Sequence, residues 1–320
     1  MTELAPRRRL RSTGAVISVG ECMVELTRGN DARFSLAFGG DTFNTAVYLA
    51  RAGVDVSYAT AVGDDPYSAD IISAAKSEGV ATDLIQILPG RMPGLYVIET
   101  TAQGERSFWY WRDRAAARDL FEEAAPSITS ALAKARLIYF SGVTLSLYSA
   151  HSLDVFAAAL SQAKSNGCTI AMDSNYRPRG WAGDIKRARA TFERFWRMSD
   201  IALPTFEDEQ MLWGDTSPTV TADRLQGYGV TEIVVKNGAE GALVRTRAGN
   251  QLVACPSAVV PLDTTAAGDS FNAGYLAQRL TGAEPSLAAL QGHRLAAVVI
   301  QHRGAIVPSV ATDPILNGKL

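Results

Sequence analysis

Cysteine and long apolar segments are scarce in this chain of 320 residues, and each scarcity excludes a class of protein. The three cysteines (Cys22, Cys168, Cys255) are scattered and form no Cys-x-x-Cys pair, so neither a disulfide framework nor a zinc site is indicated. No segment approaches the roughly 18 apolar residues that a membrane-spanning helix needs. The formal net charge of −2 lacks the basic excess typical of nucleic-acid-binding proteins.

Two common nucleotide-binding motifs are also missing. The pattern Gly-x-x-x-x-Gly-Lys-Ser/Thr does not occur, which excludes a P-loop enzyme. No Gly-x-Gly-x-x-Gly follows the first expected strand, which weakens a dinucleotide-binding interpretation. The three histidines (His151, His293, His302) do not pair with a plausible serine nucleophile, and we interpret them as helix residues.

What the chain does contain is a regular alternation of β-rich runs with helical patterns, in a sequence that is 47% hydrophobic. The expected strands span residues 15–20, 56–62, 137–141, 169–173, 200–203 and 232–236. The expected helices span residues 44–52, 67–78, 149–166, 185–198, 219–228 and 286–301. Several of the strands are apolar throughout, as in parallel sheets covered on both faces. The alternation predicts an α/β fold with a doubly wound sheet, whose ligands bind beyond the carboxyl ends of the strands.

We expect one domain over residues 15–312, between an N-terminal tail (1–14) and a C-terminal tail (313–320). Four arginines within residues 7–11 resemble a twin-arginine export signal, but the apolar run at 15–19 is too short for one. A reduced, cytoplasmic enzyme is therefore the default expectation.

Two regions, 22–36 and 92–112, break the alternation. They are β-rich, with turn residues at 29–30 and 103–104. Alternation along such strands places Tyr96, Ile98, Phe108, Tyr110 and Arg112 on one face. We expect a small β-strand lid that excludes water from a reaction; the alternative is an edge extension of the main sheet. The exposed edge of a lid could pair with a second copy, which favours a homo-oligomer.

The most informative segment is 263–274, which reads Asp-Thr-Thr-Ala-Ala-Gly-Asp-Ser-Phe-Asn-Ala-Gly. A polar turn leads into small residues, a carboxylate at Asp269 and then a helical pattern. Small residues let amides at a helix N-terminus approach an anion, which the helix dipole also favours. Asp269 could then accept the proton of a hydroxyl that attacks a bound phosphorus. The alternative is an ordinary capped helix, since Asp and Ser are common cap residues.

Further polar segments follow the expected strands or precede a helix. Gly39-Gly40 permits close backbone approach, and Asp41 and Asn44 offer polar groups suited to sugar hydroxyls; a Gly-Gly turn with a helix cap explains them too. Arg177, in the segment 173–178, could bind a carboxylate or phosphate in a bidentate way. Arg112 on the lid is a second candidate cation, although most arginines are surface residues.

The segments 236–241 and 205–209 supply candidates for nucleotide and metal binding. Lys236 could reach phosphates, while Gly238 and Gly241 could leave room for a nucleoside; a β-turn explains these glycines equally well. Asp208 could hold Mg²⁺ through water, because Mg²⁺ keeps much of its hydration. An acidic first helical turn is an equally good interpretation of that carboxylate.

Taken together, these segments resemble the ribokinase-like (PfkB) carbohydrate kinases over roughly residues 15–310. Residues 263–269 are similar to the C-terminal signature of that family, and residues 39–44 to its N-terminal glycine motif. Segments 20–26, 94–100, 104–106, 110–112 and 173–178 are similar to the branch that phosphorylates 2-keto-3-deoxygluconate. The resemblance implies transfer of phosphate from ATP–Mg²⁺ to the 6-hydroxyl of that sugar acid, often with a monovalent cation such as K⁺.

The resemblance also implies a role for each site residue. Asp269 is the expected base, and Ala266, Ala267 and Gly268 are expected to present amides to the phosphoryl group. Residues expected to hold the sugar acid are Gly40, Asp41, Asn44, Tyr96, Tyr110, Arg112 and Arg177. Residues expected at the ATP site are Asn175, Lys236, Gly238, Gly241 and Thr265. Asp263 is the expected ligand of a monovalent cation, and Asp208 that of Mg²⁺, although Thr205 stands where the family often has Asn.

Two alternatives stay open at this point. A kinase of the same fold could act on fructose, ribose or a nucleoside, although the two arginines favour an acid. A non-catalytic sugar-acid sensor would not need the intact Asp269 and its small neighbours. The helix dipole predicts a weak base at Asp269, which suffices if the hydroxyl loses its proton late in a loose transfer.

Overall fold

The computed structural model describes residues 14–29, 31, 33–100, 106–122, 126–256, 259–316 and 318. The expected tail up to residue 13 and the turn at 103–104 lie outside these ranges. The strands are β1 (Val16–Val19), β2 (Met23–Arg28), β3 (Phe34–Gly39), β4 (Val56–Val62), β5 (Ile85–Ile87), β6 (Leu95–Thr100), β7 (Arg106–Trp111), β8 (Leu137–Ser141), β9 (Thr169–Asp173), β10 (Ile201–Ala202), β11 (Glu232–Lys236), β12 (Ala242–Thr246) and β13 (Gly249–Val253).

The α-helices in these ranges are α1 (Asp41–Arg51), α2 (Pro66–Ser77), α3 (Pro126–Leu132), α4 (Gly142–Leu147), α5 (Ala150–Ser165), α6 (Ile185–Trp196), α7 (Phe206–Trp213), α8 (Pro218–Gly227), α9 (Ala267–Leu280), α10 (Pro285–Val299) and α11 (Ser309–Leu316). Several of them begin at a side-chain cap, as Asp65 does for α2 by accepting from the amides of Tyr67 and Ser68. Short 3₁₀ turns lie at Ala116–Asp119, Pro178–Trp181 and Gly238–Glu240.

The main sheet has the strand order β13-β12-β11-β10-β9-β8-β1-β4-β5. Strands from β11 through β5 pair in parallel, whereas β12 and β13 form an antiparallel edge. The chain starts at β1 in the middle and winds outward in both directions. The expected doubly wound α/β fold is therefore confirmed, and the carboxyl ends of the parallel strands meet along one edge.

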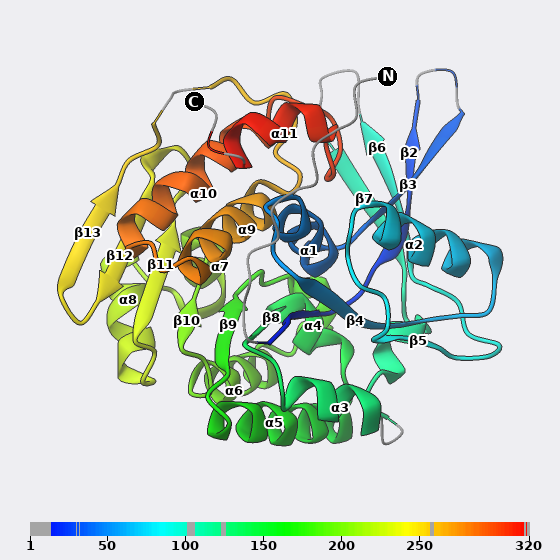
Figure 1. Ribbon diagram of the computed structural model, residues 1–320, viewed down its shortest axis with the longest axis horizontal. Helices are drawn as coiled ribbons and strands as arrows, with labels where there is room; N and C mark the ends of the chain where they lie inside the picture. The colour runs from blue at the N-terminus through cyan, green and yellow to red at the C-terminus, as the bar shows by residue number, and fades with distance from the viewer. Residues whose placement is uncertain are drawn as a thin grey trace.

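Helices cover both faces of this sheet (Figure 1). Neighbouring strand residues point to opposite faces, so Ile138 and Phe140 pack with α3, α5 and α6, while Leu137 and Tyr139 pack with α1, α9 and α10. Each parallel strand thus contributes to two cores, which is why these strands read as continuous apolar runs in the sequence.

The regions that break the alternation form a second sheet, with the order β3-β2-β6-β7, which we call the lid sheet. It is separate from the main sheet, so the alternative of an edge extension is wrong. The register pairs Tyr96 with Tyr110 and Ile98 with Phe108, so these four side chains share one face as expected. Strand β3 ends at Gly39, immediately before α1, which brings one end of the lid sheet to the edge where ligands are expected.

One boundary differs from expectation. Helix α11 continues past residue 312 to Leu316, because Ile315 and Leu316 pack against the core on the side of α1 and α10. The C-terminal tail expected from residue 313 is thus helical over its first residues.

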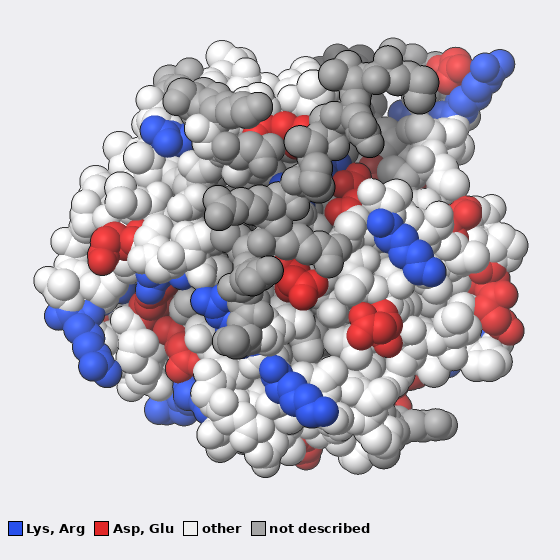
Figure 2. All heavy atoms as spheres, viewed as in Figure 1, with Lys and Arg blue, Asp and Glu red and all other residues white. Residues whose placement is uncertain are grey.

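Acidic and basic side chains are interspersed over the face shown in Figure 2, in keeping with the net charge of −2. In the described part of the chain, every helix is too short or too polar to cross a bilayer.

Candidate active site

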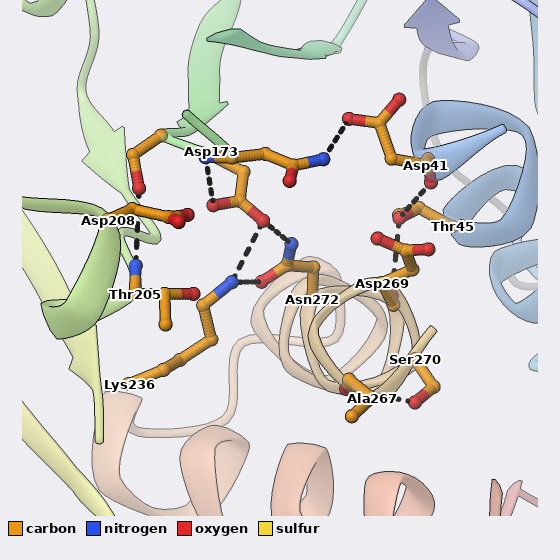
Figure 3. A network of polar contacts seen from close by, with 12 residues as sticks. Asp41, Thr45, Asp173, Thr205, Asp208, Lys236, Ala267, Asp269, Ser270 and Asn272 are labelled. Carbon is orange, nitrogen blue, oxygen red and sulfur yellow. Dashed lines mark hydrogen bonds and ion pairs between the residues drawn. The ribbon is translucent and has the colours of Figure 1, made fainter. Parts of the chain in front are cut away.

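Polar side chains from distant parts of the sequence meet at the carboxyl ends of the parallel strands (Figure 3). Asp173 is the last residue of β9 and Lys236 is the last residue of β11, so both emerge at the same edge. Helix α1 begins there with Asp41, and α9 begins there with the turn that carries Asp269. The structure therefore brings together the segments 39–44, 173–178, 236–241 and 263–269.

Backbone strain marks two positions of this site. Ala266 (φ 59°) and Asn175 (φ 31°) lie in the left-handed region, which residues with a Cβ rarely adopt. Ala266 is the N-cap of α9, and its conformation turns the chain sharply into the helix. Strained residues held in this way cluster at functional sites, and both positions belong to the expected set.

One of the three amides expected to face the phosphoryl group is already engaged within the turn itself. The Ala267 amide already donates to the Thr264 carbonyl (3.2 Å), whereas the Gly268 and Asp269 amides are among those that a helix leaves without an intrahelical acceptor. A Cβ placed on Gly268 would meet only Lys236 Nζ, at 3.5 Å, so the ammonium group lies directly beside this turn. We call the backbone of residues 266–269 the cradle.

Asp269 is half-buried, with protein around its carboxylate on most sides. Its Oδ2 accepts from Asn44 Nδ2 (2.8 Å), and its main-chain oxygen accepts from Thr45 Oγ1 (3.2 Å). Burial, the nearby Asp41 carboxylate and Asp173 raise the pKa of Asp269 to about 7, although the Asn44 hydrogen bond and Lys236 oppose the rise. The expectation that the helix dipole makes Asp269 a weak base is wrong here, because desolvation and like charges outweigh the dipole.

Gly40 is required by a close approach between two backbone segments. A Cβ at this position would lie 2.0 Å from the main-chain oxygen of Glu21, which only a glycine avoids. This approach fixes the start of α1, where Asp41 Oδ2 accepts from Asn175 Nδ2 (2.5 Å). Asn175, expected at the nucleotide, thus contacts the side chain expected to bind the sugar.

Two buried glutamates hold side chains of the lid sheet. Glu21 forms an ion pair with Arg112, and Glu25 accepts a hydrogen bond from the Tyr96 hydroxyl. Burial raises the pKa of Glu21 even though Arg112 opposes the shift. Tyr96 packs against Tyr110 with ring centroids 5.8 Å apart. Three of the residues expected to hold the sugar acid, Tyr96, Tyr110 and Arg112, therefore lie on or directly beside the lid sheet, and two of them are held by glutamates that the sequence analysis did not identify.

Arg177 is paired with Asp208, the carboxylate expected to hold Mg²⁺ through water. The two groups are 2.8 Å apart, and Asp208 also accepts from the Tyr176 amide (3.3 Å). Burial raises the pKa of Asp208, although Arg177 opposes this. The Arg177 side chain stays 58% exposed, although its Nη1 donates to both Asp208 Oδ1 and the Tyr176 main-chain oxygen (2.8 Å each).

The two glycines expected at the nucleotide differ in their surroundings. Gly241 (φ 99°) must be a glycine, because a Cβ there would lie 2.3 Å from the Val253 main-chain oxygen, whereas a Cβ on Gly238 would meet nothing within 4 Å.

The Asp263 carboxylate accepts from the Thr265 amide (3.0 Å) and hydroxyl (2.7 Å) and from the Gly304 amide (2.7 Å). Donors therefore surround the oxygens expected to bind a monovalent cation. Elsewhere too, the described residues contain no cluster of three or more His, Cys, Asp or Glu side chains suited to a metal ion.

The sequence analysis gave no role to Glu21, Glu25, Asp173 and Asn272, which contact residues of this site. The sequence contains signals for two of them, Asp173 and Asn272. Asp173 is the first residue of a polar segment at the end of a strand. Lys236 ends an apolar strand, and a lysine there needs a buried partner of opposite charge such as Asp173. Asn272 follows Asp269 by three residues and so lies on the same side of α9.

An α/β sheet with a carboxylate and free amides at a helix N-terminus, beyond its strand ends, is suited to group transfer on an anionic substrate. Comparison with known proteins agrees. The family described as pfkB family carbohydrate kinase matches residues 14–312. The 2-dehydro-3-deoxygluconokinase of Dickeya dadantii (strain 3937) is 43% identical over 306 residues, which cover 93% of this chain and 98% of that enzyme. The chain therefore belongs to the pfkB family of carbohydrate kinases.

Solved structures show the same fold. A 2-dehydro-3-deoxygluconokinase from Thermotoga maritima has a TM-score of 0.82 at 22% identity, covering 97% of this chain and 100% of its own. A fructokinase with bound ATP from Xylella fastidiosa has a TM-score of 0.80 at 19% identity, covering 96% and 99%. The fold of the family thus extends over nearly the whole length of this chain.

Proposed function

We propose that this chain transfers phosphate from ATP to the 6-hydroxyl of 2-keto-3-deoxygluconate, giving 2-keto-3-deoxy-6-phosphogluconate and ADP. The substrate is the one that the name of the Dickeya dadantii relative states, at 43% identity over almost the full length. The observation that carries the reaction type is the half-buried Asp269 carboxylate beside the cradle. Sugar binding is assigned to Gly40, Asp41, Asn44, Tyr96, Tyr110, Arg112 and Arg177.

Asp269 is the proposed proton acceptor. With a pKa of about 7, it is ionised in a large part of the molecules at neutral pH and is still basic enough to accept a proton. Asn44 holds one carboxylate oxygen, which leaves the other for the substrate hydroxyl. The acceptor is thus positioned by α1 and by its own helix, and the reaction needs little movement of the base.

Two arginines would recognise the carboxylate of the sugar acid. Arg112, 17% exposed, is held by Glu21 at one nitrogen, and its Nε has no partner among the described residues. Arg177 is more exposed and paired with Asp208. Guanidinium groups bind carboxylates with directional, charge-assisted hydrogen bonds, which favours an acid over a neutral sugar.

The residues fit ATP at the cradle. The free amides of α9 and the Lys236 ammonium group beside Gly268 would hold its phosphates, and the open space at Gly238 would admit the nucleoside. Asn175, Gly241 and Thr265 are assigned to the same site. We infer that Mg²⁺ is held by the phosphates and water, because Asp208 is already engaged by Arg177. When bound, the ion neutralises charge on the phosphoryl group. A potassium ion at Asp263 stays a prediction from the family resemblance.

We also infer a homo-oligomer and a cytoplasmic location. On the lid sheet face opposite Tyr96, the large apolar side chains of Phe34, Leu36, Trp109 and Trp111 are exposed, beside the Arg28–Glu99 ion pair. A cluster of exposed apolar side chains on a small sheet is typical of a contact between proteins.

The experiment that tests the function is ADP release with ATP–Mg²⁺ and a panel of acceptors. The panel contains 2-keto-3-deoxygluconate, its galactonate epimer, fructose and ribose. We expect turnover with the keto-deoxy acid to exceed that with the neutral sugars by a wide margin. Preferred turnover of fructose or ribose would assign a different kinase activity, and no ADP release with any acceptor would leave only a binding role.

A further inference from the structure

A buried ion pair lies behind the cradle and is not explained by substrate binding alone. Lys236 Nζ donates to Asp173 Oδ2 (2.8 Å), and the two side chains are only 8% and 5% exposed. Asn272 bridges them, accepting from Lys236 Nζ (3.0 Å) and donating to Asp173 Oδ2 (2.6 Å). Tyr139, on β8, accepts from the same Asn272 amide group (3.0 Å). Figure 3 shows Asp173, Lys236 and Asn272 between the end of β9 and the side of α9.

Stability alone gives little reason for such a pair. Desolvating two charges costs several kcal/mol per ion, and apolar residues of similar size often stabilise a core equally well. The position of the pair points instead to the reaction. Lys236 Nζ lies beside Gly268, and Asn272 follows Asp269 by three residues on α9. A lysine ammonium group has three N–H donors, and here two are occupied, which leaves one for a ligand in the cradle.

We propose that Asp173 and Asn272 are positioning residues that hold the Lys236 ammonium group at the back of the cradle, and that the charges of Lys236 and Asp173 set how readily Asp269 accepts a proton. This inference rests on the proposed function. Asp173 and Asn272 do not touch the reacting atoms in this scheme. They fix the position of the ammonium group, and the Lys236–Asp173 ion pair determines the charge beside Asp269.

Charged groups reach Asp269 from three elements. Asp41 lies on α1, Asp173 ends β9 and Lys236 ends β11, and the hydroxyls of Tyr48 and Tyr139 lie nearby. Of these charges, Asp41 and Asp173 raise the pKa of Asp269, and Lys236 lowers it. Removing the negative charge of Asp173 should therefore make Asp269 a weaker base, and removing the positive charge of Lys236 should make it a stronger one.

The test is the pH dependence of kcat/KM for the sugar acid, measured at saturating ATP. We call the part of this profile where kcat/KM falls toward low pH the acidic limb. Asp173→Asn should move the limb to lower pH and Lys236→Met to higher pH. Each shift should be about half to one pH unit, a discounted estimate for one charge acting over several ångströms of partly hydrated protein. A purely structural role would lower activity without moving the limb in opposite directions. Shifts in the same direction, or no shifts, would overturn the proposal.

A matched control lies on the same two elements. Glu232 begins β11 and pairs with Arg279 near the end of α9 (2.7 Å), far along both elements from the cradle. Glu232→Gln should leave the limb at its wild-type pH. A limb that moves as far in this control as in Asp173→Asn would refute a local effect.

A second design keeps the test decisive if the single variants do not fold. The double variant Asp173→Asn/Lys236→Met leaves no unpaired buried charge. It should fold, keep the limb near its wild-type pH, and raise KM for ATP by about tenfold, the loss expected for one charge-assisted hydrogen bond. An unchanged KM for ATP would contradict the assigned position of the ammonium group. Failure of the proposed function is distinguishable, because the wild-type enzyme would then release no ADP with the acid.

Discussion

Replacing Asp269 with asparagine should make this protein more stable at alkaline pH while it lowers turnover by about 10²–10⁴-fold, the usual range for a lost general base. The folded chain keeps the Asp269 proton up to about pH 7, whereas the unfolded chain releases it near the ordinary pKa of 3.8. The stability that this proton contributes is complete below pH 3.8 and is lost as the pH rises through 7. The interval between those pKa values corresponds to about 4 kcal/mol, and asparagine, which cannot ionise, avoids the loss.

Because Asp269 is partly exposed, water screens some of this effect, and we expect about 2–4 kcal/mol at pH 8. The assay is urea unfolding of the wild type and Asp269→Asn between pH 4.5 and 8.5. The advantage of the variant should be small at the acidic end and should grow steadily up to about pH 7. A constant difference across this range, or a variant less stable than the wild type at pH 8, would refute the cause assigned to the raised pKa.

Three further outcomes follow from the site. In the wild type, kcat/KM should fall about tenfold per pH unit below about pH 7, where Asp269 gains its proton; a flat profile down to pH 5 would contradict this. Arg112→Ala and Arg177→Ala should each raise KM for the keto-deoxy acid more than for a neutral sugar, as steady-state kinetics with both would show, and equal effects would argue against carboxylate recognition. Gly40→Ala should cost about 2 kcal/mol or more in unfolding free energy, because its Cβ would overlap the main-chain oxygen of Glu21; unchanged stability would mean that the chain moves easily there.

Much of the fold could be predicted because the parallel strands bury both faces. The runs at 56–62, 137–141, 169–173 and 232–236 match β4, β8, β9 and β11 to the residue. Helix α1 begins earlier than its apolar pattern, because the approach of Gly40 to Glu21 sets its start. Such a contact joins distant segments and leaves no periodic signal.

The site was predictable where one segment carries the signal and not where partners come from elsewhere. The cradle could be located because small residues, a carboxylate and a helix follow one another. The partners of Arg112 and Arg177 could not be predicted, because tertiary packing alone brings Glu21 and Asp208 next to them. The direction of the Asp269 pKa shift was predicted wrongly for the same reason. The sequence indicated the helix that carries Asp269, but not that the carboxylates of Asp41 on α1 and Asp173 on β9 lie close to it.

The most direct test of the central claim is a crystal structure with the keto-deoxy sugar acid and a non-hydrolysable ATP analogue bound together. We predict that a carboxylate oxygen of Asp269 lies about 3 Å from the 6-hydroxyl of the sugar, with the terminal phosphate of the analogue over the cradle. A sugar bound with its 6-hydroxyl turned away from Asp269, or with another side chain at hydrogen-bond distance from that hydroxyl, would contradict it.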